Sequence, residues 1–211
     1  MTMRSLSMFL LAHVWFLMIT RSIAQFVVDT NGKPVERNKE YFIRSAAISG
    51  IGGDSILVSR NGSCLLQAGL DNNYMANGLA VKFTPFAAHH DDDYLRLNRD
   101  LRITFQTSSS CCAQSTDWRL GEKDATSGRQ MIIIGRDGGT VGSYGNFFRI
   151  VQIYTGGTLY YIQWCPTEVC PNCRFECGTV GTIWENGKIL LALGGGSAHP
   201  IVLHKTNRGP W

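Results

Sequence analysis

Short apolar segments alternate with turns rich in glycine, asparagine and aspartate along most of the chain. The segments contain many β-branched and aromatic residues, and none keeps the apolar spacing of an amphipathic helix for long. We expect strands at Tyr41–Ile48, Ser55–Val58, Leu79–Phe83, Leu101–Phe105, Gln130–Ile134, Phe147–Tyr154, Leu159–Trp164, Thr179–Trp184, Ile189–Leu193 and Ile201–His204. Between them, dipeptides such as Asn31-Gly32 and Asn186-Gly187 are typical of tight turns, because both residue types tolerate a positive φ. Many short strands at this spacing predict an all-β barrel or sandwich.

The N-terminus departs from this pattern. One early arginine precedes the apolar run Met8–Ile19, and the small residues Ser22 and Ala24 follow in the arrangement that signal peptidase accepts. The run is too short for a comfortable membrane span, and no later segment approaches one. We therefore expect a signal peptide at residues 1–24 and a single secreted domain at residues 25–211, without a membrane partner.

Charge and compartment narrow the class of protein. The whole chain has a formal charge of +4, which falls to +2 once the signal segment and its two arginines are removed. So small a positive charge argues against nucleic acid as a partner. In a secreted chain the cysteines should be oxidised, and Asn61-Gly62-Ser63 is an N-glycosylation acceptor that we expect to be occupied.

Four of the seven cysteines lie within thirteen residues, at Cys165, Cys170, Cys173 and Cys177. Zinc-bound thiolates are one interpretation, although spacings of five, three and four residues are loose for a zinc site. Two nested disulfides, Cys170–Cys173 inside Cys165–Cys177, are the other interpretation. An oxidising compartment favours the disulfides.

Three patterns resemble reactive sites without the context that such sites need. Cys170-Pro-Asn-Cys173 is similar to a short redox motif, but no βαβ pattern surrounds it. The run His89–Asp93 offers five potential metal ligands, yet consecutive residues cannot all converge on one ion. Serines and histidines follow no nucleophile-elbow pattern. We expect no enzymatic activity, no metal site and no cofactor.

A family resemblance begins just after the expected cleavage site. Val27–Val35, followed by Tyr41–Ile43, resembles the signature of the plant Kunitz-type family, whose members are similar to soybean trypsin inhibitor. Cys112–Trp118 resembles the second-cysteine block of that family, and Cys165–Gly181 the cysteine-rich block of its miraculin-like members. The resemblance covers essentially all of residues 25–211. It implies a β-trefoil, in which three four-stranded units of about 62 residues close one barrel.

The resemblance also implies a further disulfide and a function. Cys64 would pair with Cys112, which leaves Cys111 either as a buried thiol in a monomer or as the bridge of a Cys111-linked dimer. The function implied is that of a secreted, glycosylated plant-defence protein that inhibits a serine-type endopeptidase by inserting a substrate-like loop. The alternative is a trefoil that has lost inhibition and recognises a protein or carbohydrate partner.

The family's inhibitory loop carries a serine-proline-aromatic-basic pattern, and its counterpart here departs from it. The matching loop residues are Pro85, Phe86, Ala87 and Ala88. The specificity position therefore falls on Ala87, and the asparagine that braces the family's loop falls on Arg37, with Asn38 adjacent. Both departures count against trypsin inhibition at this loop. Alanine would suit the small pocket of an elastase-like or subtilisin-like protease.

The late cysteine cluster offers a second candidate loop. Arg174 immediately follows Cys173, between two cross-links that would stiffen the chain. A rigid, exposed arginine is what a trypsin-like pocket recognises, and Phe175 would then lie just past the scissile bond. The alternative is that Arg174 is simply a solvated turn residue. We expect that, if the protein inhibits a trypsin-like protease, it does so through Arg174 and not through Ala87.

Overall fold

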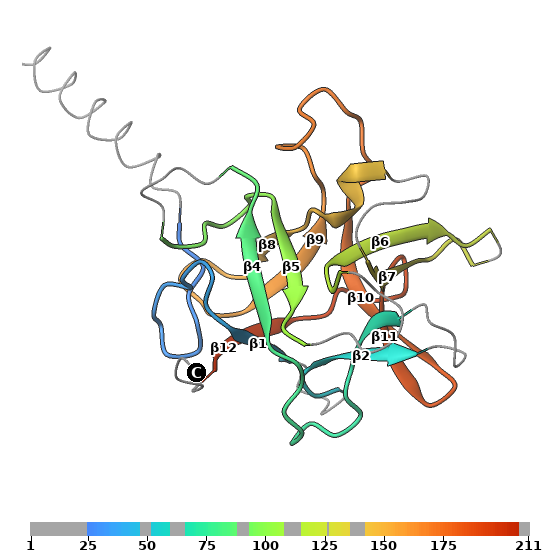
Figure 1. Ribbon diagram of the computed structural model, residues 1–211, viewed down its shortest axis with the longest axis horizontal. Helices are drawn as coiled ribbons and strands as arrows, with labels where there is room; N and C mark the ends of the chain where they lie inside the picture. The colour runs from blue at the N-terminus through green and yellow to red at the C-terminus, as the bar shows by residue number, and fades with distance from the viewer. Residues whose placement is uncertain are drawn as a thin grey trace, which may run out of the picture.

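A computed structural model describes residues 25–46, 52–59, 66–87, 93–107, 115–125, 127–135 and 142–206. Within these ranges the chain forms twelve short strands and one 3₁₀ helix, η1 (Gly142–Asn146). No helix in the described part of the chain has the length and apolar character needed to cross a membrane. The all-β class expected from the sequence is confirmed (Figure 1).

The strands fall into three consecutive units of four. They are β1 (Tyr41–Ser45), β2 (Ser55–Ser59), β3 (Leu66–Leu70) and β4 (Val81–Pro85), then β5 (Leu101–Phe105), β6 (Trp118–Lys123), β7 (Gln130–Ile134) and β8 (Arg149–Gln152), then β9 (Tyr160–Trp164), β10 (Gly178–Glu185), β11 (Lys188–Leu193) and β12 (Ile201–Lys205). The units begin at residues 41, 101 and 160, so successive units are offset by 60 and 59 residues. This spacing is close to the expected unit length.

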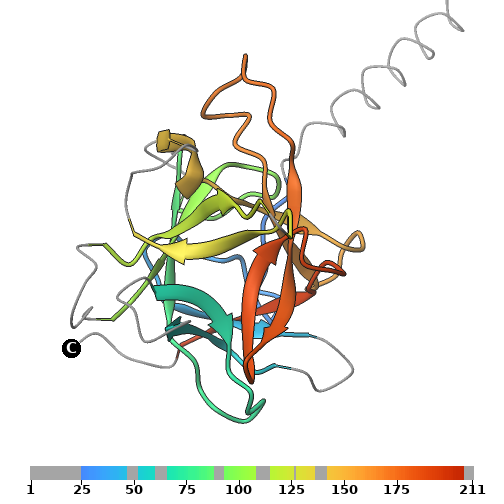
Figure 2. The same cartoon turned by 90° about the vertical axis from the view of Figure 1, so that its right-hand side faces the viewer.

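The first and last strands of each unit form a barrel, and the middle strands form a cap. Antiparallel pairing joins β1 to β4, β4 to β5, β8 to β9, β9 to β12 and β12 to β1, and a bridge between Leu101 and Phe148 links β5 to the start of β8. The hairpins β2–β3, β6–β7 and β10–β11 pair with one another through β3, β7 and β11 and cover one end of the barrel (Figures 1 and 2). This is a β-trefoil, as the family resemblance implied.

Alternating side chains of the barrel strands fill the interior. β5 and β9 share the burial pattern in which the first, third and fifth residues point inward, and β1 follows it at its first and third residues. The largest fully buried side chain is Trp118 at the start of β6, whose indole lies against the rings of Phe105 (5.6 Å) and Phe148 (6.3 Å). The core therefore extends from the barrel to the base of the cap.

Each unit has a corner where the chain leaves the barrel and enters its cap hairpin. In the first unit Asp54, directly before β2, pairs with Arg44 of β1 (2.6 Å). In the second unit Asp117, directly before β6, accepts a hydrogen bond from the hydroxyl of Thr104 (2.6 Å). In the third unit Cys177, directly before β10, closes the same corner through a disulfide. A buried carboxylate thus closes the corner in the first two units, and a disulfide closes it in the third.

Two strands were missed in the sequence, and the strands expected at Tyr41–Ile48 and Phe147–Tyr154 are shorter than expected. Leu66–Leu70 and Trp118–Lys123 contain few β-branched residues, and each includes a glycine. Gly69 is required by its neighbours, because an added Cβ would lie 2.4 Å from the carbonyl oxygen of Ile189. Tertiary pairing, and not local propensity, therefore determines these strands. The expected strand Phe147–Tyr154 is ordered as a strand only over β8.

The turns were predicted well. Asn186 and Gly187 both have positive φ, 50° and 74°, and form the two-residue connection between β10 and β11. At the N-terminal signature, Gly32 has φ 73°, and the carboxylate of Asp29 accepts hydrogen bonds from the N–H groups of Asn31 and Lys33. The residues on either side of this second turn form a bridge between Val28 and Pro34.

His199 makes the stability of the fold depend on pH. Its side chain is buried at the entrance to β12, and desolvation lowers its pKa from 6.5 to about 4. Between these values the unfolded chain takes up a proton that the folded chain does not. We expect the free energy of unfolding to fall by up to about 3 kcal/mol as the pH drops from 6.5 to 4, and His199→Gln to remove this part of the slope. Denaturant titrations at several pH values test it, and equal slopes in both proteins would contradict it.

Candidate functional site

Two loops carry the residues that the sequence singled out. The β4–β5 loop (residues 86–100) contains the family's inhibitory position, and the cysteine loop (residues 165–177) joins β9 to β10. Figures 1 and 2 show the cysteine loop projecting well beyond the barrel, on the side away from the loop that joins β3 to β4 (residues 71–80). Of the β4–β5 loop, residues 88–92 lie outside the described part of the chain.

The described start of the β4–β5 loop is closely tied to the barrel. Pro85 is the last residue of β4, and the N–H of Phe86 donates to the carbonyl oxygen of Asp100 (2.8 Å) at the other end of the loop. The Phe86 ring packs edge-on against Phe147 (5.4 Å between centroids) but stays 46% exposed. Ala87 is exposed just beyond it. Ala87 therefore sits on a supported stem.

The segment that contains Arg37 and Asn38 lies against the far end of this loop. The N–H of Arg37 donates to the carbonyl oxygen of Asp93 (2.7 Å), and Glu36 forms a bridge with Tyr94. Asn38 has φ 59° and forms the turn that leads into β1. The main chain of Arg37 thus contacts the loop at the place where the family places its bracing asparagine.

Each end of the β4–β5 loop also has an aromatic ring covered by an arginine. At the far end Tyr94 lies edge-on to Phe26 (5.7 Å), and the Arg96 guanidinium lies 5.0 Å from the centre of the Phe26 ring. At the near end the Arg102 guanidinium lies 5.0 Å from the centre of the Phe147 ring. Cation–π contacts of this kind add modest stability to exposed surfaces. They support the two ends of the loop.

The cysteine loop is closed by two nested disulfides, Cys165–Cys177 and Cys170–Cys173. The structure therefore has the disulfide arrangement, and these four sulfurs form no zinc site. Within the loop, the N–H of Cys170 donates to the carbonyl oxygen of Pro166 (3.1 Å), and that of Cys173 to the carbonyl oxygen of Cys170 (3.1 Å). Cross-links and turns together restrict the shape of the loop.

Phe175 anchors the second half of this loop. Its ring packs edge-on against Trp164 (5.3 Å) and Tyr144 (5.6 Å), and the Trp164 indole N–H donates to the carbonyl oxygen of Tyr144 (3.3 Å). Arg174 and Glu176, on either side, are exposed. The loop therefore presents the Arg174 side chain to solvent on a backbone that Phe175 holds against the body of the protein.

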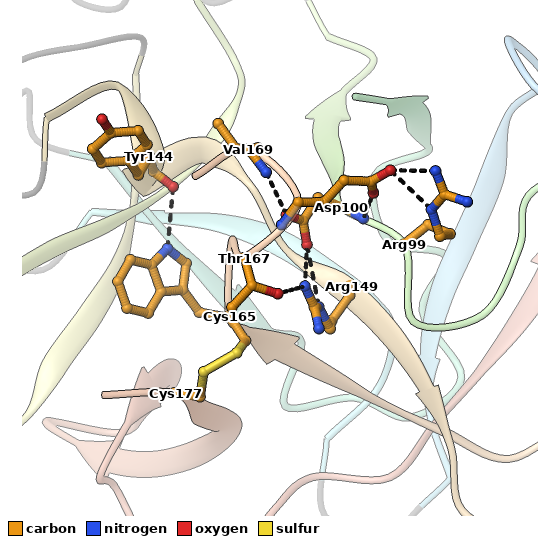
Figure 3. Close-up of polar contacts among 10 residues, drawn as sticks. Arg99, Asp100, Tyr144, Arg149, Cys165, Thr167, Val169 and Cys177 are labelled. Carbon is orange, nitrogen blue, oxygen red and sulfur yellow. Dashed lines mark hydrogen bonds and ion pairs between the residues drawn. A yellow bond between two sulfur atoms is a disulfide. The ribbon is translucent and has the colours of Figure 1, made fainter. Parts of the chain in front are cut away.

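Asp100 holds the first half of the cysteine loop (Figure 3). Its Oδ2 accepts hydrogen bonds from the N–H groups of Glu168 (2.7 Å) and Val169 (3.1 Å). Its Oδ1 accepts from Nη2 of Arg149 (2.5 Å), which also donates to the hydroxyl of Thr167 (3.0 Å). The Asp100 side chain is fully buried, and that of Arg149 is 14% exposed. The barrel end thus binds three consecutive loop residues.

The Glu168 side chain in turn binds the loop that ends at Asp100. Its Oε2 accepts the N–H of Asp100 (3.0 Å), and its Oε1 pairs with Arg99. Burial raises the pKa of Glu168, but the hydrogen bonds from Arg99 and Asp100 outweigh burial and hold this pKa below its usual value. The carboxylate therefore stays ionised into mildly acidic solution, and the contact persists there.

This network was missed in the sequence. Glu168 and Asp100 are 68 residues apart, and a single aspartate before a strand is an ordinary turn signal. The inward-facing position of Asp100, directly before the strongly patterned β5, is the one available hint. Only the closure of β5 against β8 and β9 brings the charges together.

Several expected sites lie outside the described residues. These are Asn61, Cys64, Ala88, the run from His89 to Asp92, Cys111 and Cys112. The pairing of Cys64 with Cys112, the state of Cys111 and the glycosylation of Asn61 therefore stay predictions. Among the described residues, no group of three or more histidine, cysteine or acidic side chains is arranged to hold a metal ion.

Comparisons with known proteins agree with one another. A family model described as trypsin and protease inhibitor matches residues 27–205. Kunitz type trypsin inhibitor 104 from Medicago truncatula is 67% identical over 205 residues, covering 97% of this chain and all of the relative, and inhibitor 106 from the same plant is 61% identical over 199 residues, covering 94% and 96%. A solved Kunitz-type cysteine protease inhibitor from potato superimposes with a TM-score of 0.72 at 24% identity, covering 89% of this chain and all of that one.

Proposed function

The chain belongs to the plant Kunitz family of trypsin and protease inhibitors, and from that membership we propose that it inhibits a serine-type endopeptidase by presenting a substrate-like loop. The close relatives named as trypsin inhibitors match along almost their whole length, which supports this proposal. The inhibitor performs no chemistry of its own. Its partner's active site supplies the nucleophile, and the inhibitor supplies a loop already in the bound shape.

The physical basis of inhibition is the low entropic cost of binding. A flexible peptide loses conformational freedom when it enters an active site, whereas a rigid loop has little to lose. A rigid loop also holds the scissile peptide bond in place. If the protease hydrolyses that bond, the two new chain ends separate slowly. Both candidate loops meet part of this requirement, because each is tied to the barrel by hydrogen bonds and aromatic contacts.

The observation that carries the assignment of the loop is the exposed Arg174, which lies between Cys173 of the inner disulfide and Cys177 of the outer one. We assign Arg174 to the primary specificity pocket of a trypsin-like protease, and Phe175 to the position after the scissile bond. Ala87 lacks a basic side chain and fits only a small pocket, as in elastase-like or subtilisin-like enzymes. The cysteine loop is therefore our candidate for trypsin-like targets.

The same proposal includes secretion. Residues 1–24 have the pattern of a signal peptide, and the two disulfides of the cysteine loop are of the kind that persists in oxidising compartments. Secretion would place the inhibitor among extracellular endopeptidases and expose Asn61 to glycosylation.

A titration against a panel of proteases tests the proposal. Purified secreted protein is mixed in increasing amounts with trypsin, chymotrypsin, elastase, subtilisin and papain. We expect stoichiometric loss of trypsin activity. Inhibition of elastase or subtilisin alone would instead point to Ala87. Silence across the whole panel would contradict inhibition and favour a trefoil that binds a protein or carbohydrate partner.

A further inference from the structure

Asp100 contacts the stems of both candidate loops. It is the last residue of the β4–β5 loop, and its carbonyl oxygen accepts the N–H of Phe86, the first residue of that loop. Its carboxylate accepts the N–H groups of Glu168 and Val169 at the stem of the cysteine loop. Main chain and side chain of one residue therefore hold two loops that are far apart in sequence.

The surroundings of Asp100 leave it little freedom to move. Its side chain is fully buried, both carboxylate oxygens accept hydrogen bonds, and its own N–H is bound by the Glu168 carboxylate. Arg149, the first residue of β8, neutralises the negative charge of Asp100 through an ion pair. A buried carboxylate with this many donors is held in a single orientation, because any rotation would leave buried donors unsatisfied.

We propose that Asp100 is a positioning residue for protease inhibition, which fixes the direction in which the cysteine loop leaves the barrel. This inference rests on the proposed inhibitory function. The disulfides and the bond between Asp100 and the loop restrain different motions. The Cys165–Cys177 bond closes the loop on itself and Phe175 holds its second half, but neither binds its first half to the barrel. The hydrogen bonds from Glu168 and Val169 to Asp100 supply that restraint.

Asp100→Asn tests this role with a minimal change of shape. An amide nitrogen cannot accept a hydrogen bond, so the asparagine side chain cannot serve Arg149 and both loop N–H groups together. The main-chain bond to Phe86 does not depend on the side chain. The substitution therefore loosens the cysteine loop and leaves the stem of the β4–β5 loop closed.

Asp54→Asn is the matched control. Asp54 is also a fully buried carboxylate paired with an arginine, Arg44, but it directly precedes β2, and Figure 1 shows β2 well away from the cysteine loop. The same chemical change at the two positions should destabilise the fold to a similar extent. A difference in inhibition between the two variants then reports on the loop and not on overall stability.

Two measurements are made on the full secreted chain and both variants. The first is the trypsin inhibition constant with its association and dissociation rates. The second is the rate of cleavage after Arg174 at catalytic amounts of trypsin, followed by mass spectrometry of reduced samples. For Asp100→Asn we expect an inhibition constant raised at least about tenfold, mainly through faster dissociation, and cleavage faster by a similar factor. Asp54→Asn should stay within about threefold of the parent in both.

Equal effects of the two variants, or no effect of Asp100→Asn, would overturn the proposal. If the parent inhibits no protease, the proposed function fails, but the cleavage rates still decide whether Asp100 positions the loop. If Asp100→Asn does not fold, Glu168→Ala takes its place. This substitution removes the acceptor of the Asp100 N–H and a partner of Arg99, but it keeps Asp100 itself. We expect the inhibition constant and the cleavage rate to rise, as in Asp100→Asn. Parent-like rates in Glu168→Ala would then count against the proposal.

Discussion

Arg174→Ala is expected to raise the inhibition constant for a trypsin-like protease by at least about 100-fold. The arginine would place its guanidinium against the aspartate of the specificity pocket, and alanine would leave that buried charge without a partner. Because Arg174 is exposed and its neighbour Phe175 holds the backbone, the substitution should leave the fold unchanged. Titration of trypsin with the parent and the variant measures the effect.

Two further variants show whether the effect belongs to this position. Arg174→Lys keeps a basic side chain and should retain most of the inhibition. Ala87→Asp introduces a charge at the family's usual position, and trypsin inhibition should survive it. The opposite result, with inhibition kept in Arg174→Ala and lost in Ala87→Asp, would make the cysteine loop a scaffold and would return the inhibitory site to the β4–β5 loop.

Trp118→Ala is expected to lower the free energy of unfolding by about 3–5 kcal/mol. Trp118 is fully buried, and its indole contacts Phe105 of β5 and Phe148 directly before β8. Its carbonyl oxygen also accepts a hydrogen bond from the Asn146 side chain at the end of η1 (2.9 Å). Alanine would leave a cavity where the cap meets the barrel. Equilibrium denaturation in guanidinium chloride measures the loss.

The chain contains its own control for this substitution. Trp184 on β10 is 64% exposed, so Trp184→Ala removes the same atoms from the surface. We expect a change within about 0.5 kcal/mol. A loss at Trp184 comparable to that at Trp118 would mean that the exposed tryptophan packs more closely than its accessibility indicates.

The strands that could be predicted from the sequence are those whose own residues favour a strand. Leu101–Phe105 and Gln130–Ile134 were predicted with the observed bounds, because alternating or continuous β-branched residues end there at clear turn residues. Leu66–Leu70 gave no such signal, because its conformation is imposed by β2, β7 and β11 from other parts of the chain. Turn positions follow from local sequence and the unit length follows from the family resemblance, whereas pairing across units follows from neither.

The site shows the same division. The nested disulfides could be predicted from the spacing of the cysteines together with the signal segment, and the exposed position of Arg174 from the polarity of the loop. The contact of Asp100 with Glu168 and Val169 could not be predicted, because it depends on the closure of the barrel. The Phe175 ring is an intermediate case. An aromatic residue in a loop commonly packs on the body of the protein, but its partners Trp164 and Tyr144 come from two different units.

The outer disulfide, Cys165–Cys177, determines what would follow a cut after Arg174, because it joins the chain on the two sides of that bond. Hydrolysis of the bond after Arg174 leaves the new carboxyl end beside Cys173, which is joined to Cys170, and the new amino end two residues before Cys177, which is joined to Cys165. Neither end can diffuse away, so cleavage gains little entropy and the reverse reaction has a high effective concentration of both ends. A protease bound to this loop can therefore reseal the bond that it has cut. The intact and the cut inhibitor become two interconverting forms of one covalent molecule, and cutting does not by itself exhaust the inhibitor.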